Sequence, residues 1–211
     1  MSCHDPHTSK ASGLAMLKSV QHAPFEAREC ASCHEAGSTH VTGDRNLCGQ
    51  CHTETIAAID AMPVVHAAMA DSAACMTCHS PHVGDTPALL RKTGYSVCTG
   101  CHGTINLSDF QVHTPAREDC GICHTPHGGT DGRLLVETDP MVLCGGCHED
   151  AAKTHFHPMG DNTKNPDNKG KIVCTSCHSP HNSSQKALLL GDPTRGLCVR
   201  CHDPSASHSG G

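Results

Sequence analysis

The apolar residues of this chain are too scattered to predict long helices or strands. A helical period appears only in short pieces, namely Ser9–Gln21, Thr55–Met62, which ends before Pro63, and His148–His155. Glycine and proline interrupt the rest of the chain, and the polar segment Asp161–Lys171 is typical of an exposed loop. We therefore predict mostly irregular coil with a few short α-helices and little or no β-structure.

Some apolar positions nevertheless recur at fixed intervals. Leucine pairs occur three times, at Leu89–Leu90, Leu134–Leu135 and Leu188–Leu189. A single leucine or valine precedes a cysteine four times, at Leu47, Val97, Leu143 and Leu197. This regularity indicates an internal structural repeat.

The repeat is defined by the pentapeptide Cys-x-x-Cys-His, which occurs eight times and in pairs. First motifs of successive pairs start 45, 45 and 54 residues apart, and the motifs within a pair start 18, 23, 24 and 24 residues apart. The leucine pairs lie seven and eight residues after the second histidine of a Cys-His-x-Pro-His segment. We expect an incomplete leading repeat at 1–19 and four two-motif repeats at 20–62, 63–110, 111–152 and 153–211, the last ending in a Ser/Gly tail.

Composition argues against an ordinary packed core. The chain has no Trp, one Tyr, three Phe and 36% hydrophobic residues, but 17 Cys and 20 His. Its net charge of -6, with 15 basic and 21 acidic residues, gives no basic stripe, so we expect no nucleic-acid partner. No apolar run is long enough to span a membrane, and Met1 is not followed by a signal-peptide pattern, which favours a mature chain or a fragment.

The motif has the chemistry of covalent haem attachment. Two cysteines separated by two residues form thioethers with the two vinyl groups of one porphyrin, and the next histidine binds the iron. The predicted attachment cysteines are Cys30, Cys33, Cys48, Cys51, Cys75, Cys78, Cys98, Cys101, Cys120, Cys123, Cys144, Cys147, Cys174, Cys177, Cys198 and Cys201. The predicted proximal ligands are His34, His52, His79, His102, His124, His148, His178 and His202.

Other uses of paired cysteines fit this pattern poorly. A structural zinc site does not require a histidine directly after every second cysteine. A disulfide framework is disfavoured by the odd number of cysteines and by the same strict histidine position. A thioredoxin-like site needs one such motif, not eight in glycine-rich coil.

The remaining histidines supply a distal ligand for each iron. The candidates are His22 and His40 in the first repeat, His66 and His82 in the second, His113 and His127 in the third, and His155 or His157 with His181 in the fourth. His82, His127 and His181 follow a proximal histidine by only three residues, with a stiff proline between, so we expect each to bind a neighbouring haem. The alternative is that some are merely exposed. The seven methionines hold no repeated position, which disfavours methionine ligation and favours low potentials.

Both chain ends hold further candidates. The segment around Cys3, His4 and His7 has the form of a Cys-His-x-Pro-His segment without its first cysteine, so we expect a ninth haem there, with His7 as an axial ligand. His208 follows His202 by six residues, as His40 follows His34, and is a candidate ligand, unless it belongs to a disordered tail. Haems near both ends predict electron transfer across chain ends.

The alternation of HxxxREDCxxCHTPH at His113–His127 with LCxxCH at Leu143–His148 resembles the doubled-CxxCH multihaem cytochromes. Among these it is most similar to decahaem periplasmic cytochromes that feed outer-membrane porin conduits, and it also resembles extracellular cytochromes that form filaments. The resemblance covers roughly His22 to Asp203 and departs where CHEAGSTH replaces the usual segment. It implies haem c as cofactor and a thin protein wrapping on stacked haems. It also implies haem attachment outside the cytoplasmic membrane of a prokaryote, in the periplasm, at the outer membrane or outside the cell.

An electron-transfer function is favoured over catalysis. Iron with two strong ligands changes oxidation state without binding a substrate, and this chain has more histidines than its irons need. The alternative is a multihaem reductase with one open-coordination haem. The expected partners are other redox proteins or copies of the chain joined end to end, with a porin or an extracellular acceptor as further candidates.

Overall fold

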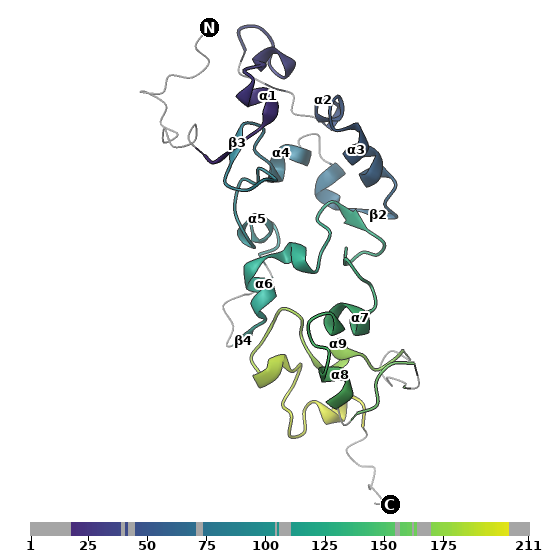
Figure 1. Ribbon diagram of the computed structural model, residues 1–211. Helices are drawn as coiled ribbons and strands as arrows, with labels where there is room; N and C mark the ends of the chain where they lie inside the picture. Colours follow the sequence, from purple (N-terminus) through teal and green to yellow (C-terminus); the bar gives the residue numbers. More distant parts are fainter. Residues whose placement is uncertain are drawn as a thin grey trace, which may run out of the picture. The chain divides into compact units, whose positions relative to one another are not determined.

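The structure is a computed structural model that describes residues 18–38, 41, 45–70, 74–103, 105, 111–154, 157–161, 163 and 170–202. Its regular elements are all short (Figure 1). The α-helices in the described residues are α1 Ala23–Glu26, α2 Arg45–Gly49, α3 Thr53–Asp60, α4 Ala74–Cys78, α5 Ser96–Thr99, α6 Thr114–Glu118, α7 Pro140–Gly145, α8 Ala151–Thr154 and α9 Cys174–Cys177. Single 3₁₀ turns lie at η2 Cys30–Ser32, η3 Ala67–Ala70, η4 Cys120–Ile122, η5 Lys186–Leu188 and η6 Cys198–Arg200.

The chain divides into two compact units. The first comprises Met1–Gly100 and Thr125–Leu134, and the second comprises Cys101–His124 and Leu135–Gly211. No helix within the described part of the chain is long and apolar enough to cross a membrane.

Three two-residue ladders connect segments that are far apart in the sequence. In the first unit β1 Val20–Gln21 pairs antiparallel with β3 Val83–Gly84, and β2 Val64–Val65 pairs with β5 Gly128–Gly129. In the second unit β4 Gln111–Val112 pairs with β6 Asn182–Ser183. Each ladder joins the start of one repeat to the residues directly after the Cys-His-x-Pro-His segment of the next repeat. The ladders therefore hold consecutive repeats together.

The recurring leucine pairs have a shared backbone role. The first leucine of each pair has a left-handed conformation, with φ of 51° at Leu89, 54° at Leu134 and 58° at Leu188. The second leucine forms an isolated bridge with a motif histidine, in the pairs His79–Leu90, His124–Leu135 and His178–Leu189. The left-handed residue turns the chain back so that this bridge can form.

The side chains of the described residues form only a small core by themselves. The buried apolar residues among those described are Ile59, Met69, Ala74 and Val83, and the first three pack together beside α3 and α4. Several large apolar side chains, including Ile122, Val136 and Leu190, are exposed. A chain of this length normally buries most of its apolar surface on folding, so the interior must be completed by other apolar groups.

The prediction of mostly irregular coil with a few short helices is confirmed. The helix expected at Thr55–Met62 is α3, and the one expected at His148–His155 is the shorter α8. The helix expected at Ser9–Gln21 is wrong at its end, because Val20 and Gln21 pair with β3; its earlier part lies outside the described residues.

The polar segment Asp161–Lys171, which we expected to be an exposed loop, is closed by contacts between the residues that flank it. Gly160 bridges Ile172, and the Thr163 hydroxyl donates to the Gly160 carbonyl at 2.8 Å and accepts from the Ile172 backbone N–H at 3.0 Å. Thr163 is consequently buried, whereas the described ends of the segment, Asp161 and Lys171, are exposed and form an ion pair.

Candidate haem-binding sites

The Cys-x-x-Cys-His motifs share one local structure, a single helical turn. In seven of them the backbone N–H of the histidine donates to the carbonyl of the first cysteine, at distances from 2.8 to 3.0 Å; these histidines are His34, His52, His79, His124, His148, His178 and His202. Residues three and four apart lie on one face of such a turn. The two sulfurs and the imidazole of a motif are therefore on the same side, as attachment to one porphyrin requires.

Six motif histidines each lie opposite a histidine from outside the motifs. The ring centroids are 5.9 to 6.1 Å apart and the ring planes are inclined by 13 to 34° in the pairs His34–His82, His52–His22, His79–His127, His124–His181, His148–His113 and His202–His157. Every pair combines one motif histidine with one other histidine. Such consistent pairing points to a shared ligand between the rings.

The separation of the rings fits an iron ion between them. Two metal–nitrogen bonds of about 2 Å, one on each face of a porphyrin, place the centroids of two axial imidazoles roughly 6 Å apart. The sixteen motif cysteines form no disulfides. The residues present thus fit haem c, which supplies a one-electron iron couple when bound.

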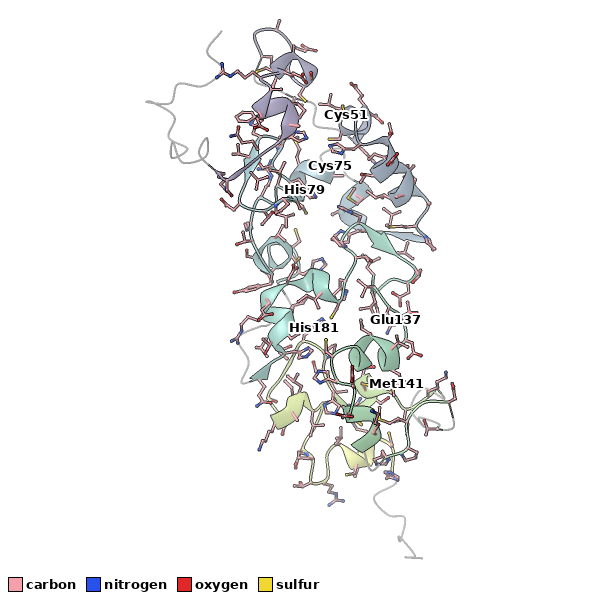
Figure 2. The ribbon with its side chains drawn as sticks, in the orientation of Figure 1. Cys51, Cys75, His79, Glu137, Met141 and His181 are labelled. Atoms are coloured by element: carbon pink, nitrogen blue, oxygen red, sulfur yellow. The ribbon has the colours of Figure 1, made fainter. Side chains whose placement is uncertain are left out.

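Backbone carbonyls orient several of these imidazoles. The Nδ1 atom of His22 lies 2.9 Å from the Pro81 carbonyl oxygen, and that of His113 lies 3.0 Å from the Pro180 carbonyl oxygen. His79 Nδ1 (Figure 2) has the same relation to the Ala88 carbonyl at 2.6 Å, and His178 Nδ1 to the Ala187 carbonyl at 2.8 Å. Since an Nδ1–H that donates to a carbonyl leaves Nε2 as the basic nitrogen, these contacts present Nε2 to a metal.

Backbone hydrogen bonds also connect ligands of different motifs. The His22 backbone N–H donates to the His82 carbonyl at 2.9 Å, and His113 donates to the His181 carbonyl at 2.8 Å. His66 donates to the His127 carbonyl at 2.9 Å in the same way. The second histidine of each Cys-His-x-Pro-His segment therefore has two roles. Its backbone carbonyl holds a histidine at the start of the preceding repeat, and its imidazole lies opposite a motif histidine.

Two of the histidines that lie opposite a motif histidine, His127 and His181, have lowered pKa values, which favours the neutral imidazole. The pKa of His127 is lowered mainly by burial and further by the nearby His79 and His66. Burial also lowers the pKa of His181, with smaller contributions from His124 and His113. A neutral imidazole is the form that binds metal.

Several attachment cysteines of the second unit are partly buried and lie close to other cysteines. Burial, together with the neighbouring Cys174 and Cys123, raises the pKa of Cys144 to about 11. Burial likewise raises the pKa of Cys123, with Cys147 nearby, and that of Cys177, with Cys201 nearby. The uncharged thiol is therefore favoured at Cys123, Cys144 and Cys177.

The structure brings together most of the predicted site residues, but not all of them can be placed. Cys3, His4, His7, His40, His155 and His208 lie outside the described residues. Of the two alternatives His155 and His157, His157 is the one seen opposite His202. From the sequence we expected His82, His127 and His181 to bind a haem other than that of the motif directly before them, and their rings lie opposite His34, His79 and His124. The sequence did not specify which motif each of them faces.

These features define a multihaem c-type cytochrome, and the chain belongs to the family of proteins with the doubled CXXCH motif. The family pattern matches residues 66–106, 113–153 and 165–207, which is more than half of the chain. Over 258 aligned residues, covering 95% of this chain and 76% of the relative, it is 26% identical to the multiheme cytochrome MtrA of Shewanella baltica (strain OS185).

Proposed function

We propose that this protein transfers electrons along a series of low-potential haems c, eight at complete motifs and a ninth at Cys3 and His4. The observation that carries the proposal is the pairing of six motif histidines with six histidines from elsewhere in the chain. Two imidazole ligands leave no open position on the iron and give it a low reduction potential. Electron transfer then requires no substrate at the metal.

The pairs support a proposed assignment of distal ligands to individual haems. We infer that His22 and His82 serve the haems of the first repeat, at Cys48–Cys51 and Cys30–Cys33 respectively. His127 serves the haem at Cys75–Cys78. In the second unit, His181 serves the haem at Cys120–Cys123 and His113 serves the haem at Cys144–Cys147. His157 serves the haem at Cys198–Cys201. By their positions in the repeat, His66, His102 and His178 are also axial ligands.

The proposal includes a location outside the cytoplasm. Support comes from the family's covalent haem attachment and from the similarity to a multiheme cytochrome of Shewanella. Acidic residues outnumber basic ones, 21 to 15, so a basic patch on a redox partner is suited to docking. Other redox proteins, further copies of this chain and an outer-membrane porin are the candidate partners.

The haem content of the purified protein tests the proposal. We expect its intact mass to include eight haems attached through two thioethers each, together with the additional group at Cys3. Reductive titration is expected to be reversible and to extend over several overlapping one-electron steps at low potential. A protein with fewer than eight covalent haems, or one that is not reversibly reduced, would contradict the proposal.

The spin state of the iron separates electron transfer from catalysis. A reductase requires one iron with an open coordination position, which gives a high-spin ferric signal. We expect the oxidised protein to show almost none of this signal in its electron paramagnetic resonance spectrum, because every iron has two histidine ligands. A high-spin signal equal to one haem per chain, lost on addition of a small ligand such as nitrite, would favour the reductase.

A further inference from the structure

One sulfur of the second unit contacts a haem-attachment site in a different repeat. The Sδ atom of Met141, on α7, lies 3.9 Å from the Sγ atom of Cys174, the first residue of α9. The carbonyl oxygen of Pro140 is 3.8 Å from the same Sγ atom. Met141 belongs to the third repeat and Cys174 to the fourth, so this contact joins two repeats.

The helix that carries Met141 also carries an attachment cysteine. Cys144 follows Met141 by three residues and therefore lies on the same face of α7. α7 and α9 are in contact (Figure 1; Met141 is labelled in Figure 2). Cys174 is among the causes that raise the pKa of the Cys144 thiol, which places the two sulfurs near each other. Met141, Cys144 and Cys174 thus form a cluster of three sulfurs.

Local hydrogen bonds fix the position of Met141. Asp139 caps the start of α7, where its Oδ1 atom accepts the Met141 backbone N–H at 2.8 Å, and Pro140 begins the helix. The next residue, Val142, has 59% of its surface exposed. The two adjacent residues of α7 therefore differ in environment: Met141 lies against an attachment sulfur, and Val142 is exposed to water.

We propose that Met141 tunes the reduction potential of the haem attached at Cys174 and Cys177, by shielding its thioether from water at the junction with the haem attached at Cys144 and Cys147. This inference rests on the proposed function. Ferric haem with two neutral ligands carries one more positive charge than ferrous haem. An apolar neighbour disfavours that charge and raises the potential.

The first unit has a different residue at the matching position. α2 and α4, which carry Cys48 and Cys75, are in contact as α7 and α9 are. Arg45 precedes Cys48 by three residues, as Met141 precedes Cys144. Its guanidinium pairs with Asp60 at 2.5 Å, and its buried Nε has no hydrogen-bond partner. The same position thus holds a thioether in one junction and a guanidinium in the other.

Charge substitutions at Met141 test the proposal in the haem-loaded protein. We expect Met141→Glu to lower the midpoint potential of the Cys174–Cys177 haem and Met141→Arg to raise it, because these charges stabilise and destabilise the ferric state. Met141→Leu, which keeps the apolar contact, should leave the potential close to that of the wild type. Redox titration followed by nuclear magnetic resonance of the haem methyl groups resolves the individual haems.

Val142→Glu is the matched control, since it places the same charge one residue away in water. Screening by solvent and salt should reduce its effect to less than about half of that of Met141→Glu. Equal shifts from the two variants, or no shift from either charged variant at Met141, would overturn the inference. If the protein carries all its haems, either of these two results contradicts the role of Met141 but leaves the proposed electron transfer intact. A wild-type protein without its haems would contradict the proposed electron transfer instead. If Met141→Glu fails to fold, Met141→Gln should lower the same potential by a smaller amount.

Discussion

Replacing His181 by alanine is expected to convert one haem, that attached at Cys120 and Cys123, from low spin to high spin. The ring of His181 lies 6.0 Å from that of His124, the proximal histidine of this haem. Its removal leaves the iron with one strong ligand. The electron paramagnetic resonance spectrum should gain a high-spin ferric signal equal to one haem per chain, and added imidazole should remove it by occupying the open position.

A second variant identifies the affected haem. Combining His181→Ala with Cys120→Ala and Cys123→Ala removes the haem that His181 is proposed to serve, so the high-spin signal should disappear. If His181 instead bound the haem of the motif directly before it, the signal would persist in the combined variant. His113→Ala is a useful comparison, because it should open the haem at Cys144 and Cys147 and leave the Cys120–Cys123 haem six-coordinate.

The second large effect is expected from Gly128→Ala in β5. A Cβ atom at residue 128 would lie 2.6 Å from the Val64 carbonyl oxygen, 2.7 Å from Met62 Sδ and 3.2 Å from Val65 Cα. Two of these atoms belong to the backbone of β2, so the β2–β5 ladder must open to admit a methyl group. Overpacking of this kind costs about 1 to 3 kcal/mol, which chemical denaturation of the holoprotein should measure.

The position of the defect predicts a spectroscopic effect as well. Gly128 directly follows His127, whose ring lies 6.1 Å from that of His79. Displacement of β5 should therefore weaken the distal bond of the haem at Cys75 and Cys78, giving a partial high-spin signal. Gly132→Ala is the matched control in the same loop, because a Cβ atom there has no neighbour within 4 Å. Equal stability of the two variants would contradict this account of the ladder.

Much of the chemistry could be predicted from the sequence because it is local. Cysteine, cysteine and histidine at positions one, four and five of a single turn fall on one side of that turn, whatever surrounds it. The eight copies of this arrangement, with too few apolar residues for an ordinary core, were enough to predict haem c and a mostly irregular chain. The leucine pairs were recognised as part of the repeat, but their backbone role was not, because a left-handed Leu89 or Leu134 has no signature in residue type.

The sequence by itself determined where the haems attach, since attachment depends on neighbours within five residues. Only the tertiary structure decided which histidine lies opposite each of six motif histidines, because those partners are 30 to 57 residues away along the chain, as in His52–His22 and His124–His181. Two-residue ladders join the start of one repeat to the residues directly after the Cys-His-x-Pro-His segment of the next. They thereby position the histidines of the pairs that cross between repeats, such as His124–His181. The same long-range packing placed Met141 against Cys174, a contact that no local pattern could specify.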